Sequence, residues 1–393
     1  MLEGIKVLEF TMNVAGPTAA AELADYGADI IKVEKMTGAE ERAFSPLIDG
    51  KSLTHCWLNR GKKSITMDMK DPRAIEIIKK LANQADVLVE SLRPGVLAKL
   101  GLGYDDLKES NPGLIYCSIS AFGQTGPYSK KPGYDVIAQA LSGMMSITGE
   151  ADGAPMRHGT TLADYFAGVA GYASIATALY HRSRTGEGQH IDMSLLNGMI
   201  HLNSMIDKLN EDIVVTRNGN HHPSIAPFGL FNGNNGESVV IAAPSGKAFG
   251  ALCNAMNRQE LIEDAKYKSV TGRANNQDEL TKTIEDWLKT YDEIEQAIHV
   301  LEAQGVACSK VNTTKDVVND PQVLHMKYLL DAPTSDDIKQ ETYMTRGPLA
   351  QFSKTPGEIR KAATLGQHTH EVLEGLGIAK EEIDAMLKDW TKE

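Results

Sequence analysis

The chain has 393 residues, of which 42% are hydrophobic and 23% are charged, as in an ordinary globular protein. This length exceeds the size at which one hydrophobic core usually stops growing, so we expect two domains. The formal net charge of −12 disfavours nucleic acid as a partner, because phosphate backbones bind positive surfaces.

The sequence shows no sign of export, of membrane insertion or of a metal site. No run of about 18 apolar residues is present, and the first residues lack the pattern of a signal peptide. We therefore expect a cytoplasmic protein that has no membrane partner. The four cysteines have neither a metal-binding spacing nor the spacing of a disulfide framework, so we expect reduced thiols and no bound metal.

Short apolar strands alternate with helices over the first 200 residues. The predicted strands are Gly4–Phe10, Asp29–Glu34, Ser64–Met69, Asp86–Glu90 and Leu114–Ile119, and the predicted helices include Ala15–Tyr26 and Pro72–Asn83. This alternation predicts an α/β fold with a doubly wound, Rossmann-like parallel sheet. Ligands of such sheets bind at the carboxyl ends of the strands.

The pattern changes after Arg217, where the loop Asn218–Pro227 is dense in turn-forming residues. A strand at Ser238–Ala243, helices at 247–257, 277–289 and 291–304, and a strand at 307–311 follow. We expect a smaller α/β domain at 225–325, and a large domain at 1–215 that is completed by 330–393. This tail carries a weak strand signal at 347–352 and helices at 369–376 and 380–388.

A lone carboxylate, Asp164, interrupts a small and apolar run between Gly159 and Gly168. The run continues to Tyr180 with apolar residues on every face, which predicts a buried helix with Asp164 near its start. An ordinary helix N-cap is one interpretation. A positioned nucleophile is the other, since carboxylates form covalent acyl intermediates. The segment alone leaves both open.

Several short motifs follow one another along almost the whole chain. They are Gly4–Phe10 with Ala15–Pro17, Gly27–Glu34, Ala85–Gly95, Phe122–Pro127, Gly133–Asp135, the run around Asp164, Thr185–Asp192, Gly305–Val311 and Asn319–Gln322. In this order the chain resembles the class III CoA-transferase family, which also contains formyl-CoA and carnitine CoA-transferases and α-methylacyl-CoA racemase. The resemblance implies a CoA-binding large domain, an interlocked homodimer, and acyl-CoA as a substrate without a tightly bound cofactor.

The resemblance favours the catalytic interpretation of Asp164, because the family's transferases have their covalent nucleophile at this position. It implies an acyl-CoA:carboxylate CoA-transferase that moves CoA between short-chain acids, dicarboxylic ones included, through an aspartyl anhydride and an aspartyl-CoA thioester. Asp164 must be ionised to attack, and we expect the positive end of its helix to oppose the effect of burial on its pKa. Backbone N–H groups of Gly123–Gly126 are candidate oxyanion donors.

The resemblance also implies a CoA pocket and, less specifically, substrate contacts. The implied CoA contacts are Lys35, Met67, Lys70, Ser91, Leu92, Arg93, Lys99 and Tyr134. For any single lysine, a solvated surface charge is the alternative. The implied substrate contacts are Gln124, Arg217, His221 and His222, and the last three are equally compatible with a polar surface loop.

Two other functions stay open. Racemases of this family carry a histidine at the position of Tyr134, and a phenol with a pKa near ~10 is a poor base at neutral pH. A 2-methylacyl-CoA racemase is therefore the less favoured alternative, and a catalytically silent CoA-binding homologue is another. A nicotinamide-dependent oxidoreductase is disfavoured, because no Gly-x-Gly-x-x-Gly motif follows the first strand.

Overall fold

The structure is a computed structural model that describes residues 1–391. Its internal contacts divide the chain into two compact units. The large unit contains Met1–Met144, His158–Ser204 and the chain from Gln322 onward, and the small unit contains Met145–Arg157 and Met205–Pro321. The domain boundaries drawn from the sequence stay a prediction, because compact units of contact need not coincide with domains.

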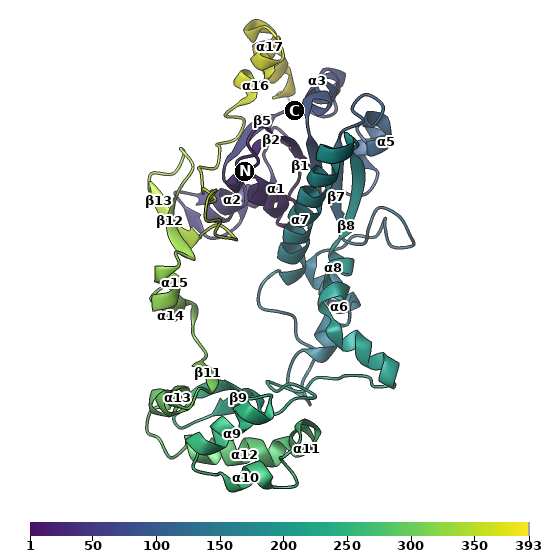
Figure 1. Cartoon of the computed structure of the whole chain (residues 1–393). Helices are drawn as coiled ribbons and strands as arrows, with labels where there is room; N and C mark the ends of the chain where they lie inside the picture. The colour runs from purple at the N-terminus through teal and green to yellow at the C-terminus, as the bar shows by residue number, and fades with distance from the viewer. Residues whose placement is uncertain (392–393) are drawn as a thin grey trace. The chain divides into compact units, whose positions relative to one another are not determined.

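A six-stranded parallel sheet forms the centre of the large unit (Figure 1). Its strands, in spatial order, are β5 (Lys62–Thr66), β2 (Asp29–Glu34), β1 (Lys6–Phe10), β6 (Val87–Glu90), β7 (Ile115–Ser120) and β8 (Gln189–Ser194). The chain starts at β1, builds outward to β5, and then continues from β6 on the other side of β1. The winding reverses between β1 and β6, which leaves a crevice at the carboxyl ends of these two strands. The predicted α/β fold is confirmed.

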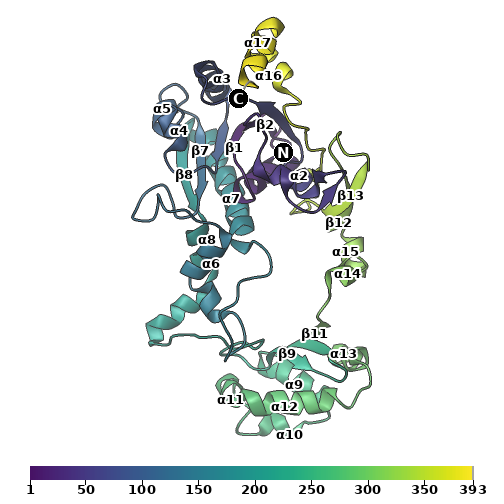
Figure 2. The ribbon, with the colours of Figure 1, turned by 180° about the vertical axis from the view of Figure 1, so that it is seen from behind.

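Helices cover both faces of this sheet (Figures 1 and 2). One core joins the sheet to α3 (Pro72–Gln84), α16 (Thr369–Gly375) and α17 (Lys380–Trp390). The opposite core joins it to α1 (Ala15–Asp25), α7 (Leu162–Thr185) and α8 (Leu195–Leu202). Val7 and Leu8 are neighbours on β1 and enter opposite cores, because side chains alternate along a strand.

Shorter elements fill the connections of the large unit. They are the 3₁₀ helix η1 (Glu40–Ala43), the strand pair β3 (Leu47–Ile48) and β4 (Lys51–Ser52), and the helices α2 (Leu53–Leu58), α4 (Val96–Lys99), α5 (Tyr104–Leu107), α6 (Asp135–Leu141) and α15 (Pro321–His325). Two further 3₁₀ helices, η2 (Met144–Ile147) and η3 (Ser204–Glu211), lie where the chain passes between units.

The small unit has its own sheet and its own core. Its antiparallel strands, in spatial order, are β11 (Ala307–Lys310), β10 (Ser238–Ala242) and β9 (Phe228–Asn232). Its helices are α9 (Gly246–Ala255), α10 (Glu260–Glu263), α11 (Val270–Asn275), α12 (Gln277–Leu288), α13 (Ile294–Ala303) and α14 (Thr314–Val317). Phe231, Leu252 and Ile284 lie in the centre of this core and are at most 1% exposed.

The weak strand signal at 347–352 is wrong. Pro348 interrupts it, and a proline cannot donate a ladder hydrogen bond. The strands of this region are β12 (Leu329–Pro333) and β13 (Thr342–Arg346), which pair antiparallel just before it. The sequence analysis also missed β8, because its residues, Gln-His-Ile-Asp-Met-Ser, are largely polar.

The helices α1 and α7 approach each other closely at Gly168. A Cβ atom on this glycine would lie 2.7 Å from the carbonyl oxygen of Ala15 and 2.7 Å from Thr18 Cβ. The glycine therefore lets the backbones of the two helices touch. Asp164 lies one helical turn before Gly168 and on the same face of α7, since residues four apart share a face.

We predict that Gly168→Ala destabilises the protein by about 1–3 kcal/mol, because the new methyl group must push two helix backbones apart. Gly250→Ala in α9 is the matched control, since the nearest outside atom to its Cβ is Ile262 Cδ1 at 3.9 Å. That control should be neutral or stabilising by up to about 1 kcal/mol. Urea unfolding followed by circular dichroism measures both. Equal stability of the two variants would show that the helices do not touch at Gly168.

Candidate active site

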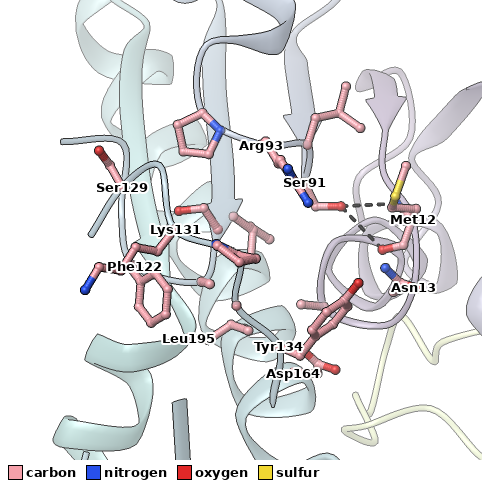
Figure 3. A pocket seen from close by; sticks show the side chains of 18 of the residues that line it. Met12, Asn13, Ser91, Arg93, Phe122, Ser129, Lys131, Tyr134, Asp164 and Leu195 are labelled. Carbon is pink, nitrogen blue, oxygen red and sulfur yellow. Dashed lines mark hydrogen bonds between the residues drawn. The ribbon is translucent and has the colours of Figure 1, made fainter. Parts of the chain in front are cut away.

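A cavity of about 360 Å³ lies at the carboxyl ends of β1 and β6, where the winding of the sheet reverses (Figure 3). The loop after β1 contributes Met12 and Asn13, and the turn after β6 contributes Ser91–Pro94. The segment after β7 contributes residues between Ser120 and Tyr134, and Asp164 enters from α7. All of these residues belong to the large unit.

Two hydrogen bonds fix the loop after β1. The backbone N–H of Met12 donates to Ser91 Oγ at 3.1 Å, which ties this loop to the turn after β6. The backbone N–H of Asn13 donates to Glu41 Oε2 at 3.2 Å. Glu41 is fully buried and forms an ion pair with Lys32 at 2.7 Å. Asn13 has a positive φ of 64°, a conformation that asparagine tolerates better than most residues.

The turn after β6 is held by a buried carboxyl group. Glu90 Oε2 accepts a hydrogen bond from the backbone N–H of Leu92 at 2.8 Å. Burial raises the pKa of Glu90 to about 7, although its hydrogen bonds with Ser118 and Leu92 act in the opposite direction. This bond orients Ser91, Leu92 and Arg93 along the wall of the cavity.

Asp164 is the third residue of α7, and its carboxyl group does not cap the helix. Asp135 does so, because its Oδ1 accepts from the backbone N–H groups of Ala163 at 2.7 Å and Asp164 at 3.3 Å. Asp135 Oδ2 accepts from Gln139 Nε2 at 2.6 Å, which fixes the cap. The N-cap interpretation of Asp164 is wrong, and its carboxyl group lines the cavity.

Burial, which is the larger cause, and the nearby charge of Asp135 together raise the pKa of Asp164 to about 7. The expectation that the helix N-terminus offsets burial is wrong, because the N–H groups of Ala163 and Asp164 in the first turn of α7 donate to Asp135 and not to the Asp164 carboxyl group. Near neutral pH, Asp164 exchanges between its ionised and its protonated form.

Five of the predicted site residues line this cavity, namely Ser91, Leu92, Arg93, Tyr134 and Asp164. Four others do not contribute to its lining. Met67 is buried in the core next to α3, whereas Lys35, Lys70 and Lys99 are exposed near the carboxyl ends of β2 and β5 and in α4. Their roles in binding CoA stay predictions.

The loop Gly123–Gly126 has two of its N–H groups already engaged. Gly123 donates to Ser120 Oγ at 2.9 Å, and Gln124 donates to Asp192 Oδ2 at 2.9 Å. Neither group is free to stabilise an oxyanion, so this part of the expectation is wrong. Gln124 lines a separate cavity of about 320 Å³ that Arg93 also borders.

The predicted substrate residues Arg217, His221 and His222 belong to the small unit. Arg217 donates to the backbone oxygens of Glu150 and Ser146 at 3.3 and 3.4 Å. His221 packs edge-on against Phe231, and burial lowers its pKa. Contact of these side chains with a substrate stays a prediction.

The sequence analysis missed several residues that line the cavity, among them Asn13, Ser129 and Lys131. Lys131 Nζ lies 3.7 Å from the ring centre of Tyr128. Lys131 could have been predicted to line the cavity, because it lies between the motifs 122–127 and 133–135. Asn13 carried none, because its importance depends on its φ angle and on Glu41.

Among residues 1–391, no three His, Cys, Asp or Glu side chains are grouped so that they could hold a metal ion. Over the same residues, no helix has both the length and the hydrophobicity that crossing a bilayer requires.

The model of CoA-transferase family III matches residues 2–369 of the chain. The chain belongs to this family. It is 37% identical to the human succinyl-CoA:glutarate CoA-transferase, over 95% of this chain and 85% of that protein. It is 34% identical to the succinyl-CoA:mesaconate CoA-transferase of Haloarcula hispanica, over 96% of both.

A solved structure of a CAIB/BAIF family protein from Brucella suis has the same fold as this CoA-transferase family member, with a TM-score of 0.81. The two chains are 34% identical, and the match covers 95% of this chain and 99% of that one. The fold expected from the family resemblance is therefore confirmed over nearly the whole chain.

We predict that Asp164→Asn stabilises the protein at pH 8 by about 1–2 kcal/mol. This value is smaller than the free energy that corresponds to the full pKa shift, because the side chain is half-buried and solvent screens its charge. The folded pKa is raised, so the folded state holds the proton more tightly than the unfolded state. The penalty on wild type is absent below pH ~4 and complete above pH ~8. Melting temperatures across this range measure it.

The exposed Asp152, given the same substitution, is the control for this pH series. Because Asp152 is exposed, its substitution reports how the change from carboxylate to amide alone affects the melting temperature. If the advantage of Asp164→Asn is equal at pH 4 and pH 8, the pKa of Asp164 is not raised.

Proposed function

We propose that the protein transfers CoA between short-chain dicarboxylic acids, with Asp164 as the covalent nucleophile. The observation that carries this proposal is a half-buried carboxyl group with a raised pKa, in a cavity at the point where the sheet reverses its winding. The matched relatives act on succinate, glutarate and mesaconate, which are all short dicarboxylic acids.

The proposed reaction proceeds through covalent intermediates on Asp164. Its carboxylate attacks the thioester carbonyl, and the C–S bond breaks to give an aspartyl anhydride and CoA thiolate. The thiolate attacks the aspartyl carbonyl and expels the first acid, which leaves an aspartyl-CoA thioester. The acceptor carboxylate then attacks this thioester, which releases CoA thiolate and forms a second anhydride. The thiolate attacks the carbonyl of the acceptor acid in this anhydride and forms the new acyl-CoA. Asp164 is regenerated without ATP.

Around the cavity, Arg93 and Lys131 supply positive charge to an otherwise acidic protein. A CoA phosphate group needs such local cations. We propose that Ser91, Leu92 and Tyr134 contact the thioester arm of CoA. The family resemblance adds Lys35, Met67, Lys70 and Lys99 at the nucleotide end, and a homodimer in the cytoplasm as its setting.

We predict that Asp164→Ala abolishes CoA exchange, because the carboxylate is the group that becomes acylated. The substitution should leave CoA binding intact, and titration calorimetry measures this. Wild-type enzyme incubated with succinyl-CoA and then hydroxylamine should carry a hydroxamate on the peptide that contains Asp164, detectable by mass spectrometry. Measurable turnover by Asp164→Ala would exclude the covalent mechanism.

We predict that succinate, glutarate and mesaconate are better acceptors than fatty or aromatic acids of similar size. A second carboxylate is costly to bury unless a cation or a hydrogen-bond donor meets it. Arg217, His221, His222 and Gln124 are the proposed partners for it. Mass-spectrometric thioester exchange with a panel of acids gives the ranking, and a best acceptor with one carboxylate would contradict the substrate class.

The same assay separates the two alternative functions. A racemase incorporates deuterium from heavy water into 2-methylacyl-CoA without an acceptor acid. Tyr134, which stands where the family's racemases carry a histidine, is 66% exposed at the N-cap of α6. A silent homologue would bind CoA and exchange nothing.

A further inference from the structure

We propose that the side-chain amide of Asn13 is a catalytic hydrogen-bond donor. Its partner is the oxygen that becomes negatively charged on the Asp164 carbonyl carbon during CoA transfer. The inference rests on the proposed function, because it requires Asp164 to be acylated. It names a catalytic residue, Asn13, that no motif of the sequence marks.

The packing of α1 against α7 brings Asn13 and Asp164 to one cavity. Asn13 lies two residues before Ala15, the first residue of α1. Asn13, Ala15 and Asp164 all line the cavity. The carbonyl oxygen of Ala15 touches α7 at Gly168, one turn after Asp164. The loop after β1 and the first turn of α7 therefore meet at the same end of the helix pair. Asn13, Tyr134 and Asp164 are seen around the pocket in Figure 3.

The backbone of Asn13 is fixed, whereas its side-chain amide is not engaged. Its N–H is bound by the buried Glu41, and the preceding N–H is bound by Ser91. Among residues 1–391 the amide group of Asn13 has no hydrogen-bond partner. At a φ of 64° a glycine would be less strained than any other residue. Asparagine differs from glycine at this position by its side-chain amide. The fixed backbone holds this amide in place, as a preorganised donor requires.

Several other donors near the cavity are occupied. The N–H groups of Gly123 and Gln124 donate to Ser120 and Asp192. The Ser129 hydroxyl donates to the carbonyl of Gly126. No described cation lowers the pKa of Asp164, since burial and Asp135 both raise it. The donor that we propose for the Asp164 carbonyl oxygen is therefore a neutral one, the amide of Asn13.

The donor acts in the two steps that occur at Cγ of Asp164. When the thiolate attacks the anhydride, a C–S bond forms and the carbonyl π electrons move onto oxygen. The electrons return as the C–O bond to the first acid breaks. In the second step the acceptor carboxylate attacks Cγ, so a C–O bond forms and the C–S bond to CoA breaks. No oxidant, reductant or further reactant is needed, and the amide N–H binds the charged oxygen more strongly than the neutral carbonyl.

The test is Asn13→Gly, which removes the amide and keeps the positive φ without strain. Removing one oxyanion donor typically lowers kcat by about 10²–10³-fold, and we expect a loss in this range with little change in either KM. Asn257→Gly is the matched control, because Asn257 also has a positive φ, of 54°, and lies exposed at the end of α9. The kcat of this control should equal that of wild type.

A second variant, Asn13→Asp, keeps the size of the side chain and replaces the donor with a carboxylate. We expect a larger loss of kcat than in Asn13→Gly. The acid limb of the pH–rate profile should move to higher pH, because a second negative charge raises the pKa of Asp164 further. The shift of this limb reports whether position 13 lies close to Asp164, as the proposed role of Asn13 requires.

The outcomes separate this inference from the proposed function. Wild-type kcat in a folded Asn13→Gly enzyme, or a loss confined to KM, overturns the role of Asn13 and leaves CoA transfer by Asp164 in place. A wild-type enzyme that neither exchanges CoA nor forms the Asp164 hydroxamate overturns both. Melting temperatures at or above the wild-type value in Asn13→Gly show that its fold is retained.

Discussion

The contact between α1 and α7 at Gly168 is the constraint on which the candidate site depends. The proposed nucleophile, Asp164, lies on α7, and the loop that carries Asn13 leads into α1. A larger residue at Gly168 would separate the two helices, because the backbone oxygen of Ala15 occupies the space of its side chain. The Rossmann-like sheet provides the crevice, but this helix contact sets which groups meet inside it.

A buried group of charges holds the other wall of the site. Glu9 of β1 pairs with Lys32 of β2 and Lys62 of β5, and Lys32 also pairs with Glu41. Desolvating such charges costs several kcal/mol per ion, so their pairing must be nearly complete. Burial lowers the pKa of Lys62 to about 8 despite Glu9. Lys62 also donates to the carbonyl of Pro17 in α1 at 2.9 Å, and Glu41 holds Asn13, so the group fixes both the loop and the helix.

The fold was predictable from local sequence patterns, whereas much of the site was not. Strand Asp29–Glu34 was predicted with its observed bounds, because Ile30, Ile31 and Val33 give it the apolar β-branched residues of a buried parallel strand. The edge strand β8 is polar and was missed. Asp164 stood out as a charge in an apolar helix, but its cap, Asp135, is 29 residues away in sequence. The roles of Asp135 and Asn13 arise from a tertiary hydrogen bond and a φ angle, which no periodicity records.

The raised pKa of Asp164 has a consequence for the proposed chemistry. Its ionised form is penalised twice, by burial and by the charge of Asp135. In the proposed mechanism, acylation removes the charge from Asp164 and transfers it to the departing thiolate, so Asp164 no longer bears either penalty once the anhydride forms. The ground state is thus raised relative to the covalent intermediates, and part of the barrier to attack is removed. On this proposal, the lower stability that we predict for the wild-type protein at alkaline pH is the cost of the reactivity of Asp164, a common trade between stability and activity. A neutral donor at Asn13 suits such a site, since a cation there would restore an ordinary pKa and cancel the gain.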